Sequence, residues 1–514
     1  MLQECNNSQN EYCRIVPDKT NNEQGVLYRN QVDINRRNIR DNEKQLIAVQ
    51  KPKEVEIVQE GLEYIQGPVS WYYFETDSEL FGISRRFHFF GDIHLSKANG
   101  CTDKYKIPCA KVDIRGRVSD MNQRCYDITY LLTSLFKNSK EEKRYTDFML
   151  ETYFKIKSVP TPLNYLSQQN NQEKELDYIN TLSKIFHQCF LISKEQCPYH
   201  PYVRFHYVDI RQSIEQPINV LNMYILLKIQ SLSGLISRYT LSVYRGIQQN
   251  ELVDMKKRVV NSIKFINHLI EKMYGPQDGS DINYNLELFH LILDSDNYVN
   301  DLNELLDQLL MGIDTNTENY EELEDLRRTM VKVIATRDGK VQHRVRAQLD
   351  ELGQENIRIR GTNLADLITE FLLQLYQEVK FTDIYSNWRK FYTIVYPAVL
   401  AIKDKNTALN AQTELKNYII SRGSGVHPAT TADALLLDGY LLARMFRTFP
   451  NPRYGRGQHV PADRVITYTG VAHTETYARF FRDILGLNPV ASQVNTINKT
   501  RCLQNSNFEE YFKV

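Results

Sequence analysis

Two short segments of the chain combine a glycine with a histidine three residues further on, Gly91–His94 and Gly470–His473. A neutral imidazole can accept a proton near pH 7, or it can ligate a divalent metal ion. Each segment directly follows a run of residues that is typical of a buried β-strand. The repeated strand-Gly-x-x-His pattern therefore predicts one site to which both histidines contribute, with His473 on an exposed turn beyond its strand.

Three carboxylates stand at similar positions. Asp92 lies inside the first motif, Glu151 ends the run that begins at Thr146, and Asp209 follows the run Tyr202–Val208. The carboxyl ends of parallel strands meet at one edge of a sheet, so we expect these groups near the histidines. As ordinary structural roles, Glu151 would cap the next segment and Asp209 would pair with Arg211.

Two chemistries remain open for this set. In one, the residues form a metal-free acid–base site, and in the other they hold a divalent ion such as Mn²⁺ or Zn²⁺. The expected catalytic residues are His94, His473, Glu151 and Asp92, and the expected metal ligands are His94, His473 and Glu151. Asp92 and Asp209 would orient the histidines, and the expected substrate-binding residues are Asp209, Arg211, Gly91 and Gly470.

The elements that position these residues follow a strand–helix–strand rhythm, which predicts an α/β fold with a mostly parallel sheet and flanking helices. Apolar residues at three- and four-residue spacing then predict a large all-helical insertion. We expect a flexible polar arm at 1–55, the first part of the α/β core at 56–215, a helical insertion or cap at 216–455, and the last strand and helix of the core at 456–514.

Composition restricts the partners. Lys+Arg and Asp+Glu are equal at 63 each, so there is no global charge signal for nucleic acid. The longest apolar stretch, 218–236, is interrupted by Lys228 and two other polar residues, which predicts a core helix and no membrane segment. The substrate, a small molecule or a peptide, and the oligomeric state stay open.

The cysteines and the first residues bear on location. The segment at the start of the chain is polar and resembles no secretory signal, so we expect the eight cysteines to stay reduced and the protein to be soluble and cytoplasmic. The pairs Cys101/Cys109 and Cys189/Cys197 lack the spacing of zinc knuckles, and we expect buried or loop thiols. Arg444 and Arg447, one turn apart, are expected on a solvated or ion-paired face, with anion binding as the alternative.

The order of these motifs resembles the erythromycin esterase/ChaN/TIKI–TraB superfamily. Its members are similar in having an early G-x-x-H or G-E-x-H after a strand, then a glutamate after the second strand, and a late G-x-x-H. The resemblance implies an α/β core with helical insertions. It also implies hydrolase-like activity in some branches: a metalloprotease in one, a histidine-dependent esterase in another and haem-iron uptake in a third. By motif match, it implies His94, Glu151 and His473 as site residues; many members have Glu or Thr where Asp92 stands.

Other interpretations remain. A protein can keep such a fold without its chemistry and serve as an interaction or structural module. Gly91-Asp92-Ile93-His94 also resembles the opening motif of metallophosphoesterases, although the chain contains no Gly-Asn-His motif. The Asn- and Tyr-rich composition is similar to that of uncharacterised proteins of large DNA viruses.

The predicted arm can be tested directly. Its composition is too polar to support a hydrophobic core, so deletion of residues 1–54 should leave the melting temperature of the remaining chain within about 2 °C. Differential scanning calorimetry of the two proteins measures this. Insolubility of the shortened chain would contradict the prediction.

Overall fold

The structure is a computed structural model. It describes residues 3–4, 14–15, 61–93, 100–119, 123–153, 178–191, 197–209, 217–275, 284–295, 297–315, 317–336, 344–378, 382–420, 428–450, 459–495 and 500–512. His94, Arg211 and nearly all of the arm predicted at 1–55 lie outside the described residues.

A six-stranded sheet forms the centre of the α/β part, and its strand order is β10-β9-β15-β5-β4-β16. The first four strands run parallel, whereas β4 and β16 are antiparallel to their neighbours. The mostly parallel α/β fold predicted from sequence is thereby confirmed. The bounds are β4 (Ser70–Thr76), β5 (Arg85–Asp92), β9 (Thr146–Tyr153), β10 (Val203–Asp209), β15 (Arg464–Gly470) and β16 (Ala491–Val494).

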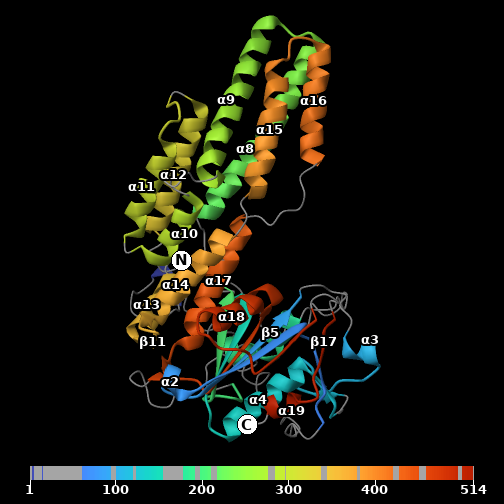
Figure 1. The fold of residues 1–514 in the computed structure, drawn as a ribbon, viewed down its shortest axis with the longest axis vertical. Helices are drawn as coiled ribbons and strands as arrows, with labels where there is room; N and C mark the ends of the chain where they lie inside the picture. Colours follow the sequence, from blue (N-terminus) through green and yellow to red (C-terminus); the bar gives the residue numbers. More distant parts are fainter. Residues whose placement is uncertain are drawn as a thin grey trace, which may run out of the picture.

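Different helices cover the two faces of this sheet. Successive strand residues point to opposite faces, so Phe90 and Leu150 pack against α4 while Phe89 and Met149 pack on the other side. We call these the α4 face and the α17 face (Figure 1). The α4 face carries α4 (Ile128–Glu141), α6 (Tyr178–Ile185), α7 (His187–Leu191) and α19 (Phe508–Phe512); the α17 face carries α17 (Pro428–Phe446) and α18 (Val471–Asp483).

Between β10 and β15 the described residues are mostly helical. Besides α17, the helices there are α8 (Pro217–Arg245), α9 (Gln249–Tyr274), α10 (Tyr284–Asp294), α11 (Tyr298–Leu310), α12 (Glu318–Thr336), α13 (Arg344–Gln354), α14 (Leu364–Glu378), α15 (Thr382–Leu400) and α16 (Lys405–Ile420). They extend away from the sheet, with α9, α15 and α16 reaching the far end (Figure 1).

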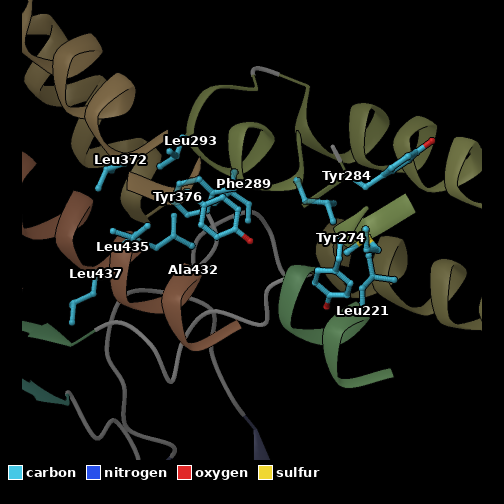
Figure 2. Packing of buried hydrophobic residues seen from close by; sticks show 14 of the residues in the cluster. Leu221, Tyr274, Tyr284, Phe289, Leu293, Leu372, Tyr376, Ala432, Leu435 and Leu437 are labelled. Carbon is cyan, nitrogen blue, oxygen red and sulfur yellow. The ribbon is translucent and has the colours of Figure 1, made fainter. Parts of the chain in front are cut away.

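The hydrophobic core of these helices is continuous with the α17 face of the sheet. One cluster of buried residues runs from Phe89 and Met149 to α10, α14 and α17. Figure 2 shows Phe289 and Tyr376 within this packing, and their rings stack with centroids 4.3 Å apart. Helix α17 links the two parts, because it packs on α13, α14 and α8 and also contacts β10 and α18.

Among the described helices, α8 alone is long and apolar enough, from Val220 to Arg245, to cross a membrane by length and composition. Core helices of soluble proteins pass the same test. Leu221, Ile225 and Ile236 are buried in the helical packing, and Lys228 forms an ion pair with Glu322 of α12. Only 35% of the apolar span is buried, so part of α8 lies in the core as predicted, and Leu227 and Tyr244 are exposed.

The remaining described elements are short. They are β1 (Gln3–Glu4), β2 (Arg14–Ile15), β3 (Tyr64–Gln66), α2 (Ser78–Phe81), α3 (Cys101–Tyr105), β6 (Lys111–Val112), β7 (Val118–Ser119), β8 (Cys125–Asp127), β11 (Arg358–Ile359), β12 (Thr362–Asn363), β13 (Phe449–Pro450), β14 (His459–Val460) and β17 (Cys502–Gln504). Strands β17, β3 and β8 form a second, three-stranded sheet.

Three disulfides contradict the expectation of reduced cysteines: Cys101–Cys502, Cys109–Cys125 and Cys189–Cys197. Each pair has Cα atoms 4.6–4.8 Å apart, within the range that a disulfide spans. The expectation was wrong because it inferred the redox state from the start of the chain, whereas the fold brings distant cysteines together. The cysteines therefore give no support to a cytoplasmic location, since disulfides persist mainly in oxidising compartments.

A buried polar network joins strands β9 and β10 to helix α17. Arg204 donates two hydrogen bonds to Asp147, and His206 Nε2 lies 2.9 Å from the same carboxylate. Arg444 of α17 donates to His206 Nδ1 at 2.7 Å. Nearby, Arg447 is buried and ion-paired with Glu351, as the ion-paired interpretation predicted.

The network fixes the protonation of its members. Burial opposes ionisation of Asp147, but Arg204 and His206 outweigh it and hold the pKa of the Asp147 carboxyl well below its usual range. Burial lowers the pKa of His206 to about 4, against the opposing effect of Asp147. His206 is therefore a neutral imidazole that donates from Nε2 to Asp147 and accepts from Arg444 at Nδ1.

This arrangement predicts a pH dependence of stability. Below about pH 6.5 the unfolded chain protonates His206 and the folded chain does not, so His206 alone should lower stability toward pH 4 by at most about 1.4 kcal/mol per pH unit. His88, whose pKa burial also lowers, adds a slope of the same sign. The free energy of unfolding in urea between pH 7 and 4.5 measures this; above pH 4.5 Asp147 remains ionised in both states. His206→Gln should reduce the slope, whereas His290→Gln, at a partly exposed position, should not. Equal slopes in all three proteins would refute the assignment.

Candidate functional site

The glycines that open the two G-x-x-H motifs lie at the ends of adjacent strands. Strand β15 pairs in parallel with β5 along its whole length, which sets Thr469 opposite Gly91 and Gly470 opposite Asp92. On its other side β15 pairs in parallel with β9, which carries Glu151. The predicted convergence of these strand ends is confirmed, although most of the chain separates the two motifs.

His473 lies between two carboxylates. Its Nδ1 is 2.7 Å from Asp438 Oδ1, and its Nε2 is 3.6 Å from Glu151 Oε1. The expectation of an exposed turn was wrong, because α18 begins directly after β15 and places His473 in its first turn, beside α17. The residue is only 7% exposed. Its surroundings at the two ring nitrogens are nonetheless polar rather than apolar.

Glu151 is fixed by the start of the same helix. Its Oε2 accepts a hydrogen bond of 2.6 Å from the backbone N–H of Gly470, the residue that caps α18. The amino terminus of a helix stabilises a negative charge through its dipole and its unpaired N–H groups. Glu151 thereby presents its second oxygen toward His473.

Asp438 was not anticipated from sequence. It lies in α17 and is buried. Burial raises the pKa of the Asp438 carboxyl, whereas His473 and the neighbouring Tyr477 lower it. Burial, followed by the charges of Asp438 and Glu151, raises the pKa of the Tyr477 phenol well above its usual value, so this hydroxyl stays protonated. A signal was present in the sequence, because Asp438 interrupts the apolar run from Leu435 to Leu442.

Asp92 and Asp209 do not orient His473, since its two nitrogens face Asp438 and Glu151. Asp92 shares the α4 face with Phe90, and its Oδ1 lies 3.2 Å from Arg501 Nη2. Asp209 ends β10 two strands away from β15 and is buried there. The two aspartates were also expected to orient His94, which lies outside the described residues.

The two glycines serve packing and capping. A Cβ on Gly91 would lie 2.2 Å from Ser70 Oγ and 3.0 Å from the Cα of Val471. Gly91 therefore lets the first turn of α18 approach β5 closely. Gly470 caps α18 with an ordinary φ of −59°, and its N–H binds Glu151.

Two of the three expected metal ligands can be placed, namely His473 Nε2 and Glu151 Oε1. A third protein ligand would have to be His94, outside the described residues, so the metal-dependent alternative depends on that residue. Within the described part of the chain, the one group of three or more His, Cys, Asp or Glu residues spaced to hold an ion is Cys101, Cys109 and Cys125.

No protein-family model, no curated protein and no solved structure matches this chain. The resemblance to the erythromycin esterase/ChaN/TIKI–TraB superfamily stays a prediction. The functional argument consequently depends on the geometry around His473.

The packing at Gly91 yields a stability prediction. Gly91→Ala should destabilise the protein by about 1–3 kcal/mol, because the new methyl group must displace Ser70 or the start of α18. Gly234 of α8 is the matched control, because a methyl group added there would meet nothing within 4 Å. Gly234→Ala should stabilise by up to about 1 kcal/mol. Chemical denaturation of both variants tests this, and equal effects would show that Gly91 is not tightly packed.

Proposed function

We propose that the chain is a hydrolase of the erythromycin esterase/TIKI–TraB-like type, in which His473 is the general base. The observation that carries the proposal is the placement of a carboxylate at each ring nitrogen of His473, at the carboxyl ends of adjacent parallel strands. Working residues of parallel α/β sheets gather at this edge.

Asp438 would set the tautomer of the base. An ionised carboxylate only accepts hydrogen bonds, so Nδ1 of His473 carries the proton of the 2.7 Å contact. The lone pair is then on Nε2, which can take a proton from water or from a substrate hydroxyl. Asp438 thus acts as a positioning residue, as the aspartate does in serine-protease triads.

Glu151 would complete the site. Its Oε1 is 3.6 Å from Nε2, too far for a hydrogen bond. When Nε2 gains a proton, the imidazolium lies between two carboxylates, and this arrangement stabilises the charge that proton abstraction creates. The proton held on Nε2 then passes to the leaving group, either directly or through Glu151 Oε1, which would first accept it from His473.

A non-catalytic module is the second candidate, and the low exposure of His473 is the observation that favours it. In that case the Asp438–His473–Glu151 set would only connect α17, α18 and β9. The metallophosphoesterase alternative requires Asp92 beside a metal ion. Asp92 instead faces Arg501 on the α4 face, so we do not favour it.

The two candidates predict different kinetics. The full chain is assayed with nitrophenyl esters, peptides and phosphoesters, with and without Mn²⁺ or Zn²⁺. Because His473 abstracts the proton, His473→Gln should reduce kcat by about 10²–10⁴-fold. Asp438→Asn should reduce kcat by a comparable factor with little change in KM, because it disturbs the tautomer.

His206→Gln is the matched control, because His206 is also a buried histidine that contacts a β9 aspartate and an α17 side chain. All three substitutions should cost about 1–3 kcal/mol of stability by leaving a buried partner less satisfied. Activity per folded molecule should fall only for His473→Gln and Asp438→Asn. If it stays at the wild-type level in all three, or if the wild-type chain hydrolyses no substrate in the panel, the structural-module candidate is favoured.

A further inference from the structure

Four cysteines gather beside the three-stranded sheet, and none of them belongs to the candidate active site. Cys101 begins α3, Cys109 precedes β6, Cys125 begins β8 and Cys502 begins β17. All four side chains are buried, and they share one cluster with Tyr64, Tyr105 and Ile107. The two disulfides that they form, Cys101–Cys502 and Cys109–Cys125, are therefore neighbours.

The sulfur atoms of the two disulfides lie close to one another. The Sγ atoms of Cys101, Cys109 and Cys125 are all within 4.8 Å of each other, and Cys502 is bonded to Cys101. In a tetrahedral zinc site with Zn–S bonds of about 2.3 Å, neighbouring sulfurs are about 3.8 Å apart. Binding one ion requires that the four side chains rotate to that spacing once the two S–S bonds are broken.

We propose that, once these two disulfides are reduced, the four sulfurs bind one Zn²⁺ ion as a closed four-thiolate site. A dithiol gives each disulfide two electrons and two protons and becomes a disulfide itself; a phosphine gives the two electrons and becomes its oxide, while water supplies the oxygen and the two protons. In both cases each protein disulfide becomes two thiols. Zn²⁺ then displaces the four protons. Sulfur-only donors in a buried, tetrahedral arrangement are typical of structural zinc.

The oxidised form, with two disulfides, and the reduced form, with a zinc ion, would hold the same segments together. Cys502 belongs to β17, close to the carboxyl end of the chain, and it is tied to α3 across 401 residues. Arg501, its neighbour, contacts Asp92 and the carbonyl of Ile93 at the end of β5. Either the disulfides or the zinc ion would keep this strand, and with it Arg501, in place when the redox conditions change.

The third disulfide provides an internal control. Cys189 is in α7 and Cys197 follows in the next described segment, and neither belongs to the four-cysteine cluster. Its reduction should free two thiols that gain no metal. Cys5 and Cys13 lie outside the described residues, so the experiment is also performed on a full-length Cys5→Ser/Cys13→Ser variant.

The test loads the full chain with Zn²⁺ after reduction by a phosphine and removes excess metal by gel filtration. Mass spectrometry of metals should find about one zinc per chain in the reduced protein and none in the oxidised protein. Iodoacetamide with and without EDTA, followed by peptide mapping, should show that zinc protects Cys101, Cys109, Cys125 and Cys502 but not Cys189 or Cys197.

Variants extend the test. Cys109→Ser and Cys125→Ser should lower the zinc content at least tenfold, whereas Cys189→Ser/Cys197→Ser should retain it. The alkylation pattern of the wild-type chain keeps the test decisive if a variant fails to fold. Substoichiometric zinc in the reduced wild-type chain, or zinc-dependent protection of other cysteines, would overturn the proposal.

Discussion

The candidate site depends on the position of β15 between β5 and β9, parallel to both. Parallel pairing aligns the carboxyl ends of the three strands, so Asp92, Glu151 and Gly470 reach the same edge of the sheet. The hydrogen bond from Gly470 to Glu151 exists only in this register. Gly91 contributes because a side chain there would crowd Ser70 and the first turn of α18.

Strand alternation then sorts the acidic residues between two environments. Asp147, Met149 and Glu151 point to the α17 face, whereas Leu150 points to the α4 face. Asp92 shares the α4 face with Phe90 and finds Arg501 there. Asp92 and Glu151, at the ends of the two strands that flank β15, therefore meet different partners. A motif that contains both Asp92 and His94 does not by itself place both side chains in one site.

Much of this architecture could be predicted from the sequence. The strands that carry Asp92, Glu151, Asp209 and Gly470 have the apolar runs and terminal polar residues expected of parallel strands, and their bounds differ from expectation by two residues at most. The features that could not be predicted depend on contacts between residues far apart in the sequence, or on how an element is packed. Asp438 approaches His473 from a helix that local periodicity describes only as apolar, and Cys101 meets Cys502 only after the whole chain has folded. The burial of His473 follows from α18 starting without a loop, a detail that a glycine alone does not specify.

Helix α17 supplies a partner to each of two buried histidines, His206 and His473. The two partners differ in charge, and so the two imidazoles are suited to different roles. Asp438 and Arg444 are six residues apart on this helix, about 9 Å along its axis. Arg444 donates to His206 and, together with burial, disfavours its protonation, so that histidine is suited to a fixed neutral contact. Asp438 accepts from His473, whose other nitrogen faces Glu151. A cation forming on His473 meets negative charge on both sides, whereas one forming on His206 meets a guanidinium. This difference is why we propose His473 rather than His206 as the general base, although both rings are buried and both contact an aspartate.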